Sequence, residues 1–105
     1  MPIKLFDSLE TAAERVPSGS IKKLIIKDQE YAIVHNSSGL HVVSNFCPHR
    51  QEALNKGTLN AFNEIICPLH QYRFNLNTGQ EVNNRCGHLP VIPIQINSEG
   101  VFVDL

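Results

Sequence analysis

Two short segments of the chain each combine a cysteine, a proline and a histidine. Residues 47–50 are CPHR and residues 67–70 are CPLH. A thiolate and an imidazole this close together in one loop can face a single inorganic centre, and two such loops supply two soft and two borderline ligands. The candidate metal ligands are therefore Cys47, His49, Cys67 and His70.

Two kinds of metal centre are compatible with these ligands. Zinc accepts two thiolates and two imidazoles tetrahedrally, but common zinc modules place Cys beside Cys and His beside His. Here each loop contributes one of each, which suits a binuclear centre whose two metal ions are both bound by each loop. An iron–sulfur cluster with two imidazoles on one iron is easier to reduce than an all-Cys cluster. Two buried structural cysteines with incidental histidines are the third alternative.

The cysteine count points in the same direction. Three cysteines are too few, and odd in number, for a disulfide scaffold. In a reducing compartment, cysteines paired with histidines indicate metal or redox chemistry. The third cysteine lies in Cys86-Gly-His88, which repeats the first spacing but lacks the proline. We expect this segment to pack against the two loops rather than to supply ligands.

The elements that hold these loops are predicted to be short β-strands. One helical turn is expected early, with Asp7 as N-cap, Glu10 completing a capping box and Pro17 beyond its end. After it, apolar residues alternate with period two, and Asp28-Gln29 is expected to form a hairpin turn. The strand-like runs are residues 3–6, 21–27, 30–35, 40–46, 64–67, 72–76 and a closing hairpin within 91–105. Many short strands with turns between them predict a small all-β antiparallel sandwich or barrel.

Composition excludes several functions. A chain of 105 residues makes one small domain, and 42% hydrophobic residues suffice for a core. The net charge of −1 leaves no basic excess for binding nucleic acid. No apolar run approaches the roughly 20 residues of a transmembrane helix, and the N-terminus lacks the pattern of a secretory signal. We expect a cytoplasmic protein without membrane or nucleic-acid partners.

At this point the two loops resemble the signature of Rieske-type 2Fe–2S proteins. The framework residues that also match Rieske ferredoxins are Leu54, Gly57, Phe74, the NTG at 77–79, Pro90, Pro93 and the final hairpin. The resemblance covers the whole chain. It implies a single domain, 1–105, with the Rieske β fold and an inserted cluster-binding subdomain at about residues 45–86.

The resemblance also implies the role of each ligand. Cys47 and Cys67 would bind the inner iron, and His49 and His70 the outer iron near the surface, with one cluster per chain. Pro48 and Pro68 have no N–H. Other backbone amides of the loops would donate to the cluster and tune its potential.

The branch of the family is indicated by the flanking residues. Respiratory-chain members carry an extra cysteine in each loop and a Ser and a Tyr after the last histidine, but this chain has Tyr72 and Phe74 at the latter positions. That resembles soluble, low-potential ferredoxins of oxygenase systems. The implied function is one-electron transfer from a flavin-dependent reductase to a terminal oxygenase, with no catalysis by the chain itself. The alternatives are a zinc-stabilised binding module and the small Rieske subunit of a nitrite-reductase-like enzyme.

Some residues depart from the family or have an open role. Gln51 and Gln71 stand where the family usually has glycine, which permits positive φ, so the loops are expected to differ locally. His35 and His41 are interpreted as solvated hairpin residues, and Tyr72 and Phe74 as core residues that also shield the cluster. For the arginines near the loops, a solvated rim is favoured over a docking patch for an acidic partner; these are Arg50, Arg73 and Arg85.

Overall fold

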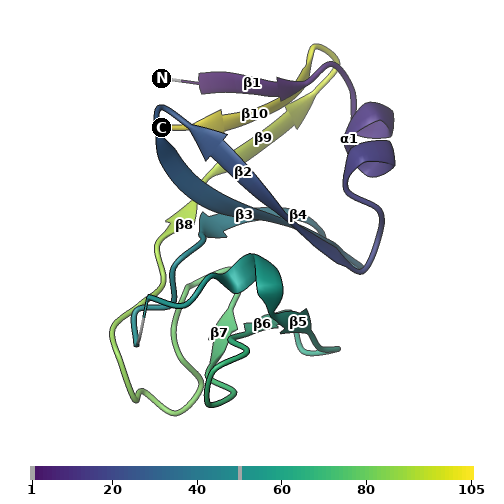
Figure 1. The fold of residues 1–105 in the computed structure, drawn as a ribbon. Coiled ribbons are helices and arrows are strands. Elements are labelled where there is room, and N and C mark those ends of the chain that lie inside the picture. Colours follow the sequence, from purple (N-terminus) through teal and green to yellow (C-terminus); the bar gives the residue numbers. More distant parts are fainter. Residues whose placement is uncertain (1, 50) are drawn as a thin grey trace.

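The computed structural model describes residues 2–49 and 51–105. Those residues form three antiparallel sheets, one α-helix and one turn of 3-10 helix (Figure 1). The strand orders are β1-β10-β9 (Pro2–Phe6, Gly100–Asp104, Ile94–Asn97), β2-β3-β4-β8 (Ser20–Ile26, Gln29–Asn36, Gly39–Ser44, Val91–Ile92) and β5-β6-β7 (Thr58–Leu59, Glu64–Ile66, Arg73–Asn75). The predicted all-β antiparallel fold is confirmed.

The four-stranded sheet separates two hydrophobic cores because its inner strands bury both faces. On β3, Ala32 and Val34 point into one core, and Ile33 points into the other. On β4, Val43 points into the first of these cores and Val42 into the second. This follows from the period of two along a strand, which sends successive side chains to opposite faces. The sheet is therefore a platform with one core beneath the metal-site loops and one beneath β1, β10 and α1 (Leu9–Arg15).

The turn between β2 and β3 is shifted by one residue from its predicted place. Ile26 pairs with Gln29, so Lys27 and Asp28 form the turn, with φ of 51° and 64°. Two-residue hairpins favour turns with two positive φ values, because their twist matches that of the strands. Gln29 is therefore the first residue of β3 rather than a turn residue.

The cap of α1 also differs from the prediction. Ser8, not Asp7, is the N-cap, and its hydroxyl accepts a hydrogen bond from the amide of Thr11 at 3.1 Å. Ser8 therefore satisfies the amide of Thr11, one residue later than the Glu10 amide that the expected capping box would satisfy. Asp7 instead forms an exposed ion pair with Lys4.

The C-terminal segment is divided between two sheets. The hairpin is confined to β9 and β10, whereas Val91 and Ile92 form β8 and pair with β4. Pro93 lies between β8 and β9, and it cannot donate to a strand ladder. Ile92, Ile94 and Ile96, which alternate along the sequence, therefore lie on two strands in different sheets.

The third sheet and a 3-10 turn, η1 (Leu54–Lys56), lie in the lower part of Figure 1, on the far side of the four-stranded sheet from β1. Gly57 ends η1 against β6, where a Cβ atom would lie 2.1 Å from the carbonyl oxygen of Ile66. Gly79, in the NTG turn, has φ of +78° and would place a Cβ 1.9 Å from the carbonyl oxygen of Leu89. Only glycine fits these two positions, so both fix how the loops approach the core.

The lengths of the helices show whether any of them could span a membrane. α1 has seven residues, and no helix within residues 2–49 and 51–105 combines the length and hydrophobicity needed to cross a membrane.

Candidate metal centre

The two Cys-His segments form loops of the same length, each closed by the same type of hydrogen bond. The amide of Cys47 donates to the carbonyl of Glu52 at 2.9 Å, and the amide of Cys67 donates to the carbonyl of Tyr72 at 2.8 Å. Loop 1 (residues 47–52) and loop 2 (residues 67–72) therefore each span from a cysteine to the fifth residue after it. Loop 1 follows β4 and loop 2 joins β6 to β7.

Both loops reverse direction through residues with positive φ. Gln51 has φ of 58° and Gln71 has φ of 59°, and each is the fourth residue after its cysteine. His70 also has a positive φ, 64°. The backbone thus keeps the glycine-like conformation although this chain has glutamine, at a cost of about 1–2 kcal/mol per residue for an L side chain. Both loops therefore carry local backbone strain at these positions.

The two cysteines lie together in the interior. Cys47 and Cys67 have no exposed surface, and their side chains are hydrogen-bonded to each other. Burial, followed by the contact with Cys47, raises the pKa of Cys67 to about 11, although the backbone amide of Leu69 donates to its sulfur and acts in the opposite direction. The thiol of Cys67 therefore stays protonated at neutral pH unless a bound metal ion stabilises its thiolate.

The two histidines lie together nearer the surface. The ring centroids of His49 and His70 are 5.5 Å apart, with planes inclined by 51°. His70 is exposed and His49 is half-buried. Among the described residues, no three or more Cys, His, Asp and Glu side chains converge on a site for one metal ion. The candidate ligands instead form a buried thiol pair and an outer imidazole pair, and this donor set fits a binuclear iron–sulfur centre.

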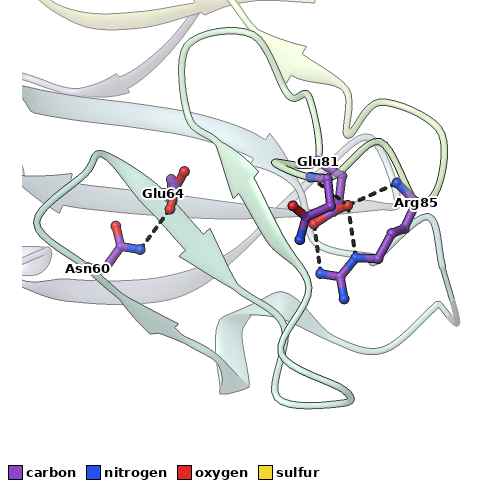
Figure 2. Close-up of polar contacts among 5 residues, drawn as sticks. Asn60, Glu64, Glu81 and Arg85 are labelled. Atoms are coloured by element: carbon purple, nitrogen blue, oxygen red, sulfur yellow. Dashed lines mark hydrogen bonds and ion pairs between the residues drawn. The ribbon is translucent and has the colours of Figure 1, made fainter.

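Glu81, which is buried, forms an ion pair with the partly exposed Arg85 (Figure 2). Glu81 has no exposed side-chain surface, and Nη2 of Arg85 lies 2.8 Å from its Oε2 while Nε lies 3.1 Å from its Oε1. The backbone amides of Asn83 and Arg85 also donate to Glu81. The Arg85 side chain, helped by these amides, lowers the pKa of Glu81 to about 2 against the opposing effect of burial.

A second buried polar residue, Asn45, supports the start of loop 1. Asn45 is fully buried two residues before Cys47, and its Nδ2 donates to Oδ1 of Asn55 at 2.8 Å. The amide of Asn55 donates back to Oδ1 of Asn45, also at 2.8 Å. This reciprocal pair fixes η1 against the start of the loop.

A further side-chain bond stabilises the turn between β5 and β6. Asn60 donates to the buried carboxylate of Glu64 at 2.8 Å (Figure 2).

Sequence reasoning missed the roles of Asn45 and Glu81, since an isolated Asn or Glu carries no local signal of burial. It placed Cys86 correctly, because this half-buried residue packs against the core that contains Cys47 and Cys67. Burial is the main cause that raises the pKa of Cys86. His88 is exposed.

The interpretation of His35 and His41 as solvated residues is wrong. Nδ1 of His35 lies 2.7 Å from the carbonyl oxygen of Val16, to which it donates, and Nε2 of His41 lies 2.8 Å from the hydroxyl of Ser38. Both residues are partly buried, and burial lowers the pKa of His41. His35 ties the β3–β4 hairpin to the C-terminal end of α1, whereas the bond of His41 lies within the hairpin and holds its turn.

The arginines near the loops differ in their surroundings, which neither a solvated rim nor a docking patch anticipated. Arg85 is part of the ion pair above, and its side chain is 37% exposed, so it is a surface residue with a fixed partner. Arg73 is partly buried on β7. The third predicted member, Arg50, lies outside the described residues.

Known proteins agree with this chemistry. The model of the Rieske [2Fe-2S] domain family matches residues 9–93. The ferredoxin component of a naphthalene 1,2-dioxygenase system from Pseudomonas aeruginosa is 28% identical over 98 residues, which cover 90% of each chain. The ferredoxin of carbazole 1,9a-dioxygenase from Nocardioides aromaticivorans IC177 superposes with a TM-score of 0.80 at 23% identity, over 98% of this chain and 96% of that one. A putative NADPH nitrite reductase small subunit gives 0.82 at 16% identity, over 100% and 99%.

The paired loops on an antiparallel β fold define an iron–sulfur electron-transfer protein. More specifically, the chain belongs to the Rieske [2Fe-2S] domain family. It is an electron carrier, its cofactor is a Rieske 2Fe–2S cluster, and the resemblance to the ferredoxins of oxygenase systems is confirmed. The identity of the four ligands stays a prediction.

Proposed function

We propose that this chain is the ferredoxin component of an oxygenase system, with its cluster held by Cys47, His49, Cys67 and His70. The observation that carries the proposal is the segregation of the donors, with two thiols fully buried against each other and two imidazoles paired nearer the surface. When bound, the cluster accepts and donates one electron at a time. The chain's own residues shield the sulfur end and expose His70.

This arrangement leaves one side of the protein available for electron exchange with its partners. An electron can enter or leave through the exposed His70, whereas the two cysteines lie among core residues such as Leu54 and Phe74. We infer that both partners use the His70 side in turn. The electron donor is a flavin-dependent reductase, and the acceptor is a terminal oxygenase.

We further propose that the chain works in the cytoplasm, as one domain with a cluster-binding subdomain at about 45–86. None of its three cysteines forms a disulfide, as expected in a reducing compartment. Cell fractionation of the natural host, with antibody detection of the chain, checks this. Recovery in the soluble fraction of spheroplasts supports it, and release with the periplasm contradicts it.

Reductive titration of the purified protein tests the carrier function. We expect one electron per chain to be taken up, with an EPR signal that integrates to one spin per two irons. Uptake of two electrons, or of none with two irons present, would contradict a one-electron Rieske carrier. A substitution of His70 by Cys should retain iron but shift the spectrum, because it replaces an imidazole with a thiolate.

The fold resemblance to a nitrite reductase small subunit favours one other candidate, a fixed subunit of a larger enzyme. Size-exclusion chromatography of a host-cell extract separates the two. A carrier is recovered near its own mass of 11.8 kDa, whereas a fixed subunit elutes with its large partner.

A further inference from the structure

The ring of Tyr72 lies between an arginine and a predicted iron ligand. On one side, the ring of His49 is stacked on it, with centroids 3.9 Å apart and planes inclined by only 11°. The guanidinium carbon of Arg85 also lies 3.9 Å from the Tyr72 ring centroid. One face of a phenol at that distance has room for one flat group. The guanidinium and the imidazole must therefore lie on opposite faces.

The guanidinium of Arg85, at the end of this stack, cannot rotate freely. Two of its nitrogens are bound to the two oxygens of Glu81, at 2.8 and 3.1 Å. Glu81 is itself buried and held by two backbone amides. A planar guanidinium bound at two points presents one fixed face, and cation–π attraction holds that face against the ring of Tyr72. The result is a continuous row of contacts from the buried Glu81 through Arg85 and Tyr72 to His49.

We propose that Arg85 is a positioning residue that acts through Tyr72 on His49, and that this row sets the orientation of the His49 imidazole and raises the reduction potential of the cluster. The inference rests on the proposed role of His49 as an iron ligand.

Two physical effects follow from this geometry. First, an imidazole pressed against a fixed ring cannot rotate about its bond to a metal, and the overlap between nitrogen and iron depends on that rotation. Second, reduction adds one negative charge to the cluster, which a nearby cation stabilises. Glu81 offsets part of the charge of Arg85, so the effect on the potential is smaller than that of an isolated cation.

The test uses the cluster-containing protein and two readouts that do not depend on any partner. One is the reduction potential. The other is pulsed EPR of the reduced cluster, which reports the magnetic coupling to the histidine nitrogens. The variants are Arg85→Met, which keeps the length of the side chain, Tyr72→Leu and the double variant. Arg15→Met is the matched control, since it removes the same charge from α1, on the opposite side of the molecule (Figure 1).

We expect Arg85→Met to shift the redox equilibrium toward the oxidised form by roughly threefold, which is about 30 mV at about 59 mV per tenfold for one electron. It should also change the coupling of one histidine nitrogen. Tyr72→Leu should change the same coupling, and Arg85→Met should add little in that background. Arg15→Met should alter neither readout.

Three results would overturn the inference. In the first, Arg85→Met leaves both readouts as in the wild type. In the second, the potential changes equally in Arg85→Met and Arg15→Met, which indicates net charge alone. In the third, the full effect of Arg85→Met persists without the Tyr72 ring. Failure of the ligand assignment itself is distinguishable, because the wild-type protein would then show coupling to fewer than two histidine nitrogens.

Discussion

Gln51 and Gln71 occupy equivalent places in the two loops, four residues after Cys47 and Cys67, and have nearly the same backbone angle, with φ of 58° and 59°. Both side chains are exposed. Neither local propensity nor burial explains a glutamine there, since glycine adopts this conformation without strain. Strain of this kind is common at functional sites, and these two residues flank the surface of the proposed centre.

Replacing either glutamine by glycine should stabilise the protein. Relief of the left-handed backbone outweighs the added entropy of the unfolded chain, so we expect a gain of about 0.5–1 kcal/mol for Gln51→Gly or Gln71→Gly. Thermal unfolding of the cluster-containing protein measures it. Gln29→Gly is the matched control, because this exposed residue begins β3 with no positive φ, and it should lower the midpoint. A drop in all three variants would argue against strain in the loops.

Gly57 should not accept a side chain. A methyl group would overlap the carbonyl oxygen of Ile66, at 2.1 Å, so Gly57→Ala must push η1 away from β6. We expect a loss of about 1–3 kcal/mol, as for other overpacked sites. Gly87→Ala is the control, since nothing lies within 4 Å of its added Cβ and its φ is not positive. Equal unfolding midpoints for the two variants would refute the close approach.

The ion pair of Glu81 should make stability fall in acid. Its pKa is lowered from 4.5 to about 2, so its contribution is complete above about pH 5 and is lost as the pH falls through the range between these values. The difference corresponds to up to about 3 kcal/mol at about 1.4 per pKa unit. Urea unfolding of the wild type and Glu81→Gln, compared at each pH, measures it.

In that comparison the acid sensitivity of the cluster ligands is common to both proteins and cancels. We expect the wild type to be the more stable protein at pH 6, and its advantage to shrink at pH 3. An advantage that does not change with pH would mean that Glu81 titrates alike in the folded and unfolded chain.

Cys86 should be dispensable for the cluster. It is half-buried beside the core that contains the other two cysteines, and burial raises its pKa, which keeps it a thiol. Cys86→Ser should retain the full iron and sulfide content, whereas Cys67→Ser should lose most of both. Loss of iron in Cys86→Ser to the same extent would place Cys86 among the ligands.

The parts of the site that could be predicted are those encoded locally. Cys47 and His49, like Cys67 and His70, are close in sequence, so a thiol and an imidazole in one loop were evident from the order of residues alone. The alternation of apolar residues likewise predicted the strands. The exact turn residues, Lys27 and Asp28, were misplaced by one because several neighbouring residues tolerate the same turn.

The parts that could not be predicted depend on contacts between distant or ordinary residues. Arg85 was interpreted as a solvated residue, since nothing in the sequence marks Glu81 as its buried partner. Asn45 gave no signal of its bond to Asn55, ten residues away. The two glutamines were recognised as unusual, but only the backbone of the folded chain reveals that they keep a glycine-like conformation.

The central claim is that Cys47, His49, Cys67 and His70 hold one Rieske cluster. Its most direct test is the visible spectrum of the protein purified without added metal, together with iron and acid-labile sulfide assays on the same sample, for the wild type and for His49→Ala and His70→Ala. We predict a red-brown protein with two irons and two sulfides per chain, and a changed or lost spectrum in both variants. A colourless wild type that holds one zinc ion, or histidine variants with the unaltered spectrum, would contradict the claim.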